Sequence, residues 1–155
     1  HALINIGGNL LAIGQHGDRP WHVGLQDPRK QEAMLELDLQ DGEAIGTSGD
    51  YQRFFMANGQ RYSHLIDPRT GQPSRTSISA TVLADGATPT PGLVSDAASK
   101  PLFIGGQPLA RHTAERFHFD KWLVVAGDGA VYLSQDMARR VHWRNPPAHI
   151  HVIQP

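Results

Sequence analysis

The sequence predicts an α+β fold: a mixed, largely antiparallel sheet with one or two helices packed on one face. Sixteen glycines and eleven prolines are spread along the 155 residues, which indicates many short elements joined by tight turns. Met34–Leu39 alternates between apolar and polar residues, as a half-buried strand does, and Ser77–Leu83 is predicted to be a strand from its alternating β-branched residues. Leu93–Gly105 is the one segment that reads as a substantial helix, although Pro101 lies inside it.

Short strands are expected through the first half of the chain. The first, almost wholly apolar, reads as a buried central strand. Asp41-Gly42 is a typical hairpin turn, so the segments on either side of it are expected to pair. The expected strands are Ala2–Ile6, Leu10–Ile13, Trp21–Gln26, Met34–Leu39 and Ala44–Thr47, followed by the short apolar segment Tyr51–Met56 and, after a turn at Asn58-Gly59, Tyr62–Ile66.

The second half is expected to contain the helices and a final hairpin. A second short helix is predicted over Gln107–Arg116, after Leu93–Gly105. Lys121–Ala126 and Val131–Ser134 flank a glycine-rich turn and are predicted to pair as a hairpin. Three arginines of the tail are expected to form a solvated strand edge, not a ligand site. They are Arg139, Arg140 and Arg144.

The composition is that of an ordinary globular domain, with 39% hydrophobic and 19% charged residues. We expect one domain over residues 1–155, a length that suits a single core. The formal net charge of -1 and the sequence pI of about 6.8 argue against nucleic acid as a partner. The absence of cysteine excludes disulfides, thiolate metal sites and cysteine nucleophiles. Because the chain opens with His1 and enters an expected core strand at once, we expect a fragment of a longer protein or a processed chain.

Two clusters of small and polar residues follow expected strands. In Gly7-Gly8-Asn9, glycines would let backbone N–H groups approach a phosphate or a flat ring, although a plain β-turn is the simpler explanation of Gly-Gly alone. Thr47-Ser48-Gly49-Asp50-Tyr51 combines hydroxyls, a carboxylate and an aromatic ring, which suit a sugar, a pyrophosphate or a heteroaromatic ring. A capped turn, with Asp50 bonded to local amides, is the alternative.

Two further clusters carry groups for acid–base or metal chemistry. Alternation places His64 and Ile66 on one strand face, and histidine titrates in the range that suits a general base. Asp67, which begins a turn ending at Gly71, either caps that turn or binds substrate. Asp96 falls in the first turn of the expected helix, where a carboxylate either binds Mg²⁺ beside substrate phosphates or caps the helix.

In this order and spacing, the four clusters resemble the C-terminal half of the ApbE-type FAD:protein FMN transferases. That family has a strand ending in Gly-Gly, a Thr-Ser-Gly-Asp-Tyr block, a His-Ile-Ile-Asp-Pro-Arg-Thr-Gly-like block and a helix opening with Ala-Asp-Ala. The similarity runs from about Leu3 to Gly106. Its blocks here are Gly7-Gly8-Asn9, Thr47-Ser48-Gly49-Asp50-Tyr51, His64-Leu65-Ile66-Asp67-Pro68-Arg69-Thr70-Gly71 and Ser95-Asp96-Ala97.

The resemblance implies a role for each block. Family members bind FAD with its pyrophosphate on Mg²⁺; a threonine hydroxyl of an acceptor flavoprotein attacks the FMN phosphorus and AMP leaves. By position, His64 is the candidate base, Asp96 the candidate Mg²⁺ ligand, and Asp67 orders the loop behind His64. The residues expected to bind flavin are Gly7, Gly8, Asn9, Thr47, Ser48, Gly49, Asp50, Tyr51, Asp67 and Gly71.

This chain departs from the family pattern in two respects. Lys100 stands where the family has a threonine as second metal ligand, and an ammonium cannot ligate Mg²⁺ but can pair with Asp96. The family's N-terminal half, with its Gly-Gly-Ile-Ala-Lys-Gly-like motif, is not in this sequence, so that half is an expected partner. Because the family is commonly exported and lipid-anchored, the resemblance implies a location in the bacterial envelope, periplasmic or lipid-anchored.

Two other functions remain open from the sequence. A module that holds FAD or FMN without transferring it is the main alternative, and Lys100 favours it. A metal-binding or structural domain using histidines is a weaker one. His149 and His151 would share a strand face, but they lie in a proline-rich tail without a nearby carboxylate.

Overall fold

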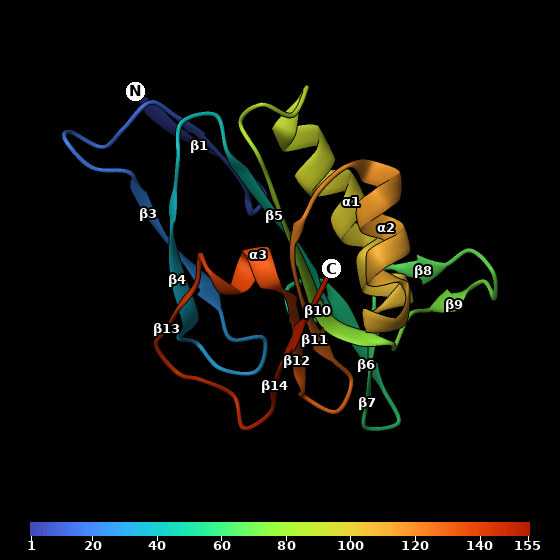
Figure 1. Cartoon of the computed structure of the whole chain (residues 1–155). Helices are drawn as coiled ribbons and strands as arrows, with labels where there is room; N and C mark the ends of the chain where they lie inside the picture. The colour runs from blue at the N-terminus through green and yellow to red at the C-terminus, as the bar shows by residue number, and fades with distance from the viewer.

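The computed structural model describes all 155 residues and has a seven-stranded sheet at its centre (Figure 1). Six of its strands pair antiparallel with their neighbours, and only the last pairs parallel, with β12. The predicted mixed, largely antiparallel sheet is thus confirmed. In spatial order the strands are β1 (Ala2–Ile6), β2 (Asn9–Ile13), β5 (Ala44–Gly49), β10 (Ser77–Ala84), β11 (Lys121–Ala126), β12 (Val131–Ser134) and β14 (Ile150–Ile153).

Three layers follow from what covers the two faces of this sheet (Figure 1). One face packs against a second sheet, in the order β13 (His142–Trp143), β4 (Ala33–Leu39) and β3 (Trp21–Gln26). The other face carries helices α1 (Pro91–Gly105) and α2 (Ala110–Phe117), as predicted. Two small hairpins lie at one end of the molecule: β6 (Phe54–Ala57) with β7 (Gln60–Ser63), and β8 (Ile66–Asp67) with β9 (Gln72–Pro73).

The helices begin and end where the sequence supplies the appropriate residues. Pro91 occupies the first turn of α1, where a missing N–H costs nothing. Pro101 removes one backbone hydrogen bond inside α1, yet the helix continues to Gly105 because it is packed against β5 and β10. A 3₁₀ turn, η1 (Gln107–Leu109), leads into α2, and a short helix α3 (Gln135–Ala138) follows β12.

Two apolar clusters hold the layers together, and strand alternation assigns residues to them. Leu123 and Val125 of β11 belong to the cluster between the two sheets, while Trp122 and Val124 belong to the cluster under the helices. The first cluster contains 15 buried residues and the second contains nine. The larger core therefore lies between the sheets, and the helices cover a smaller one.

Two strand predictions are wrong in their partners. Ala2–Ile6 forms a strand with the predicted bounds, but it is the outer strand of the sheet, and Ile6 is 77% exposed. β4 and β5 do not pair across Asp41-Gly42; they belong to different sheets. β4 and β5 each have an apolar face that must be buried. Because the chain passes from one sheet to the other at this corner, both faces are buried.

One prediction for the C-terminal arginines is also wrong. Arg140 does not lie on a solvated strand edge. Its guanidinium donates to both carboxylate oxygens of Glu43, at 2.7 and 2.8 Å, and to the carbonyl of Asp38 at 2.7 Å. The Glu43 side chain is 6% exposed and that of Arg140 22% exposed, so this ion pair fastens α3 to the β4–β5 corner. Arg139 and Arg144 do lie on the surface, each paired with a carboxylate.

Candidate functional site

A cavity of about 390 Å³ lies at the free edge of β5. This strand pairs with β10 from Ala44 to Gly49, but with β2 only at Ala44 and Ile45. Beyond Ile45, every second backbone N–H and C=O on the β2 side of the strand lacks a strand partner and is available to a ligand. The cavity is lined by Ile6, Gly7, Thr47, Ser48, Gly49, Tyr51, Gln52, Arg53, His64, Leu65, Asp96 and Lys100.

Two glycines of β5 allow close packing around this edge. A Cβ at Gly46 would stand 2.6 Å from the carbonyl oxygen of Ser95, so α1 lies directly on the strand backbone. A Cβ at Gly49 would collide with the ring of Tyr51, which folds back over the strand. Burial, and then the charge of Asp50, raises the pKa of Tyr51, so its phenol stays neutral at physiological pH. The end of β5 therefore presents backbone groups and a neutral aromatic ring to the cavity.

His64 is oriented by a backbone carbonyl at the start of the β6–β7 hairpin. Its Nδ1 lies 2.9 Å from the carbonyl oxygen of Arg53, which also accepts from the His64 backbone N–H at 3.3 Å. Because a carbonyl oxygen only accepts, Nδ1 carries the proton in the neutral ring and Nε2 keeps a lone pair. The exposed imidazole is thus set up to take a proton from a hydroxyl group in the cavity.

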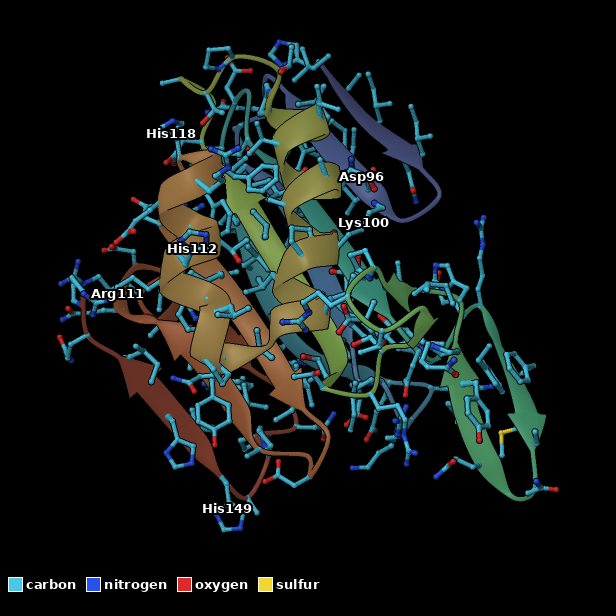
Figure 2. The ribbon with its side chains drawn as sticks, turned by 90° about the vertical axis from the view of Figure 1, so that its right-hand side faces the viewer. Asp96, Lys100, Arg111, His112, His118 and His149 are labelled. Carbon is cyan, nitrogen blue, oxygen red and sulfur yellow. The ribbon has the colours of Figure 1, made fainter.

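Helix α1 contributes a charged pair to the cavity. Nζ of Lys100 lies 2.9 Å from Oδ2 of Asp96 and donates to the Asp96 carbonyl at 2.9 Å. Figure 2 shows both side chains on the side of α1 that faces away from α2. No group of three or more histidine, aspartate or glutamate side chains converges in a way that would hold a metal ion. Asp96 is the one carboxylate that lines this cavity, and its neighbour is a cation.

The hydroxyl groups predicted to contact flavin are engaged with the protein. Thr47 Oγ1 lies 2.9 Å from Thr81 Oγ1. Ser48 Oγ lies 2.8 Å from Ser99 Oγ, which in turn donates to the Asp96 carbonyl. Both residues line the cavity, but these bonds tie the strand to its neighbours. They hold β5 in place beneath α1.

Two predicted carboxylates lie outside the cavity. Asp50 accepts two hydrogen bonds from Arg29, at 2.6 and 2.8 Å, and lines a different cavity on the other side of the chain. Asp67 accepts from the side chain of Arg69 and from its backbone N–H. These bonds lower the pKa of Asp67 and fix the turn that follows β8.

Three further predicted residues shape the surroundings. Gly8 does not line the cavity. Its N–H donates to Asn5 Oδ1 in the turn between β1 and β2. Asn9 bonds to the Gly92 carbonyl at 2.7 Å and accepts from Ser95, which pins the start of α1. Gly71 takes a φ of 70° in the β8–β9 turn, away from the cavity. Of the predicted site residues, eight thus line one cavity. They are Gly7, Thr47, Ser48, Gly49, Tyr51, His64, Asp96 and Lys100.

Comparison with known proteins places this arrangement in a family. The sequence model of the ApbE family matches residues 1–122. The chain belongs to the ApbE family. The resemblance seen in its four blocks is therefore confirmed.

Three curated relatives of this ApbE chain are each named FAD:protein FMN transferase. That of Rhodobacter capsulatus is 36% identical over 140 residues, which are 90% of this chain and 26% of the relative. That of Treponema pallidum is 37% identical, over 90% of this chain and 40% of the relative. That of Haemophilus influenzae is 33% identical, over 88% of this chain and 39% of the relative. The chain thus spans between 26% and 40% of the length of these relatives.

Solved structures of ApbE proteins share the fold. The ApbE protein of Thermotoga maritima superposes with a TM-score of 0.72 at 32% identity, over 90% of this chain and 44% of that protein. The Pseudomonas stutzeri flavinyl transferase ApbE, apo form, gives a TM-score of 0.65 at 30% identity, over 89% of this chain and 42% of that protein. The α+β architecture of this ApbE chain is thus shared with its relatives.

Four residues line the cavity that the sequence did not single out. Ile6 and Leu65 flank predicted residues, so adjacency was the available signal. Gln52 and Arg53 lie in the bend between β5 and β6. The carbonyl of Arg53 orients the imidazole, and no residue type in a sequence marks a backbone carbonyl. These contacts therefore appear only in three dimensions.

The histidines of the tail do not assemble into a centre. His151 stacks on Tyr132 with ring centroids 4.8 Å apart, and His149 precedes β14 without joining it. Figure 2 shows His149 at the edge of the molecule, far from Asp96 and Lys100.

None of the helices combines the length and apolar character that crossing a bilayer requires.

Proposed function

We propose that this ApbE chain forms the base-carrying wall of the active site of a FAD:protein FMN transferase. The observation that carries the proposal is the oriented His64, which lines the same cavity as Lys100 and the free edge of β5. Transfer of a phosphoryl-linked group needs a base for the attacking hydroxyl and positive charge near the phosphate oxygens. The names of the relatives support the same reaction.

In the proposed reaction, a threonine or serine hydroxyl of an acceptor flavoprotein attacks the phosphorus of the FMN part of FAD. The bond from that phosphorus to the bridging oxygen breaks, and AMP leaves with this oxygen and the electron pair. The hydroxyl proton passes to Nε2 of His64, which holds the lone pair because Nδ1–H donates to Arg53. The products are AMP and an acceptor that carries FMN through a phosphoester bond.

The donor set does not fit Mg²⁺ as it stands. Mg²⁺ in such sites takes one or two carboxylates together with phosphate oxygens. Asp96 offers one carboxylate, but the Lys100 ammonium, 2.9 Å away, opposes a second cation there. We therefore propose that Lys100 faces the phosphate groups of FAD in place of the metal.

We propose the β6–β7 hairpin as the side from which the acceptor approaches. Phe54, Phe55 and Met56 are 41%, 55% and 56% exposed, and the strand that follows leads directly to His64. In Figure 2 this hairpin stands away from the body of the molecule. Exposed apolar side chains next to a reactive group are typical of a surface that receives a protein partner.

Two further proposals concern the whole protein. We propose that an N-terminal half, which the longer relatives contain, pairs with β1 and completes the cavity. The support is the exposure of Ile6, which lines the cavity and lies on the outer strand of the sheet.

We also propose an envelope location, periplasmic or lipid-anchored, which rests on the family resemblance and is tested by fractionating cells.

The first experiment measures FAD binding to the 155-residue chain by flavin fluorescence, with Mg²⁺ and with EDTA. Saturable binding that EDTA leaves unchanged, and that Lys100→Ala weakens, is the expected result. Binding that requires Mg²⁺ would contradict the role given to Lys100. Glu115→Gln, a charge change on α2, is the control for nonspecific effects.

The second experiment measures FMN transfer to an acceptor by the full-length protein. Loss of a general base lowers rates by about 10² to 10⁴, so His64→Ala should reduce transfer by that factor while FAD affinity changes little. His112→Ala is the matched control, because His112 is exposed on α2 and lies apart from the cavity (Figure 2). Equal rates for His64→Ala and the control would refute the assignment of the base.

A second candidate function is a module that holds FAD or FMN without transfer. The Asp96–Lys100 ion pair favours it, since it occupies the position where the family carries a metal. Lys100→Thr in the full-length protein separates the two functions. A gain of Mg²⁺-dependent transfer over an inactive wild-type protein would favour the module, because Lys100 would then have suppressed the reaction. Transfer by the wild-type protein itself would mean that the chain works with its lysine.

A further inference from the structure

We propose that this chain has a second ligand site, which binds a phosphate group in an arginine-lined cavity on the far side of the Asp50–Tyr51 segment from the His64 cavity. The cavity has a volume of about 420 Å³ and one hydrophobic lining residue, Ile78. Three arginines line it. They are Arg29, Arg61 and Arg75.

The charges around this cavity do not balance. Arg29 is neutralised by Asp50, with two hydrogen bonds of 2.6 and 2.8 Å. Arg61 places its guanidinium over the Phe54 ring, 3.9 Å from the centroid, and donates to the backbone carbonyl of Asp50, but it has no carboxylate partner. Arg75 makes neither an ion pair nor a side-chain hydrogen bond. With Asp50 the only carboxylate in the lining, two guanidinium charges remain unpaired in one cavity.

A buried hydroxyl group without a partner points to the same ligand chemistry. Ser74 lines the cavity, is 6% exposed, and its Oγ makes no hydrogen bond. A buried hydroxyl that bonds to nothing in the protein is uncommon, because desolvation is then uncompensated. Ser77 Oγ is also unpartnered, and Ser77 lines the same cavity. We therefore assign both hydroxyl groups to the ligand site, and Ser74 is the one chosen for the test.

Arginines together with a hydroxyl favour phosphate among small anions. A guanidinium binds phosphate oxygens through paired N–H donors, and a serine O–H supplies a further donor of short reach. The volume exceeds what a free phosphate ion needs, so a phosphate monoester with a polar substituent also fits. Inorganic phosphate and AMP share this chemistry, and the two probes distinguish a site for the ion from one for a nucleotide.

The site adjoins the proposed active site without belonging to it. Asp50 and Ser63 line the arginine cavity, while their neighbours Tyr51 and His64 line the other one. Asp50 and Arg61 are already joined by a hydrogen bond, so a phosphate that recruits Arg61 acts on the segment between the two cavities. Binding here needs no FAD and no acceptor, so its test is independent of the proposed transferase function.

The test titrates inorganic phosphate, and separately AMP, into the 155-residue chain at low ionic strength, followed by calorimetry. Saturable binding of at least one probe is expected. Arg75→Gln should weaken it at least tenfold, and Ser74→Ala by several-fold. Arg19→Gln is the matched control: it removes the same charge from an exposed loop and should leave binding unchanged. Because Arg75 is exposed, its replacement should not alter the thermal unfolding of the chain.

Other results would overturn the proposal. They are saturable binding of neither probe by the wild-type chain, equal affinities for Arg75→Gln and Arg19→Gln, or loss of binding in Lys100→Thr. The last result would place the anion at the Asp96–Lys100 pair instead. Arg61→Gln provides a second variant, and it should weaken binding in the same way as Arg75→Gln.

Discussion

The two faces of the seven-stranded sheet differ in what covers them and in what they leave open. The face toward the β13-β4-β3 sheet is closed by 15 buried apolar residues. The face toward α1 has a smaller apolar cluster, and on this face the contact between β5 and α1 is made by small residues, Gly46 against Ser95 and Ser48 against Ser99. The candidate site lies at the margin of this second face.

The difference shows how one sheet serves stability and binding separately. Large side chains from two facing strands interdigitate and leave no room for a ligand. Small residues bring a helix onto a strand, so that charged groups of the helix reach the free edge of that strand. Substitutions on the two faces should therefore have different consequences. Leu123→Ala and Gly46→Ala test this on the faces themselves, and Arg140→Gln and His22→Gln test contacts of the layer beyond them.

The largest expected effect belongs to the face between the sheets. Leu123 is fully buried there, so Leu123→Ala should lower the free energy of unfolding by about 4 kcal/mol. Denaturant unfolding measures this loss. The folded fraction should still bind FAD with unchanged affinity. A loss of affinity without a loss of stability would break the separation between the faces.

The next effect concerns the ion pair at the β4–β5 corner. Arg140→Gln leaves the buried Glu43 carboxylate without its partner and should cost about 3 kcal/mol. Arg139→Gln is the control, since its pair with Asp136 is exposed and should contribute about 0–1 kcal/mol. Similar unfolding midpoints for the two variants would show that the corner pair is not a stabilising contact.

A smaller effect on stability is expected at the strand–helix contact, together with an effect on binding. Gly46→Ala forces a Cβ against the Ser95 carbonyl and should cost about 2 kcal/mol by displacing α1. FAD binding should weaken because Asp96 and Lys100 move with the helix. Gly92→Ala adds the same methyl group to α1 in open space and should be neutral or slightly stabilising. Unfolding curves and FAD titrations of the pair sharpen the comparison.

The smallest effect is a dependence on pH at the outer surface of the β13-β4-β3 sheet. Hydrogen bonds to Asp38 and then Glu36 raise the pKa of His22. A raised pKa means that the folded state binds the proton more tightly, so this stabilisation is complete below the ordinary histidine pKa and disappears as pH rises through the raised value. His22→Gln should therefore lose stability at pH 5.5 relative to wild type and match it at pH 9. A deficit of equal size at both pH values would contradict the protonated pair.

Local patterns in the sequence predicted several elements to the residue, whereas β6 and β7 have other bounds than expected and β8, β9, α3, β13 and β14 were not predicted. Ala2–Ile6, Lys121–Ala126 and Val131–Ser134 form strands with the predicted bounds. α1 differs from the predicted helix only by beginning two residues earlier, at Pro91. Alternation and turn residues act over a few positions, so a linear reading detects them. The assignment of β4 and β5 to different sheets depends on contacts between distant segments, which no local pattern records.

The site shows the same division. The Asp96–Lys100 pair is one helical turn apart and was foreseeable from spacing. Asp50 was predicted to contact flavin, but it pairs with Arg29, 21 positions away, and lines the arginine cavity instead. The carbonyl of Arg53 has no signature in the sequence at all. Roles that depend on a backbone atom or a distant partner therefore require the structure.

The bond from His64 to Arg53 has a consequence for timing. The same carbonyl accepts the backbone N–H that closes the β6–β7 hairpin and the Nδ1–H that fixes the imidazole. If the base of this hairpin opens, both bonds break and either tautomer of the ring becomes accessible. The imidazole is held in the competent tautomer only while the hairpin is closed, so local opening lowers the fraction of molecules with an oriented base. Hydrogen exchange at the His64 amide reports that fraction directly.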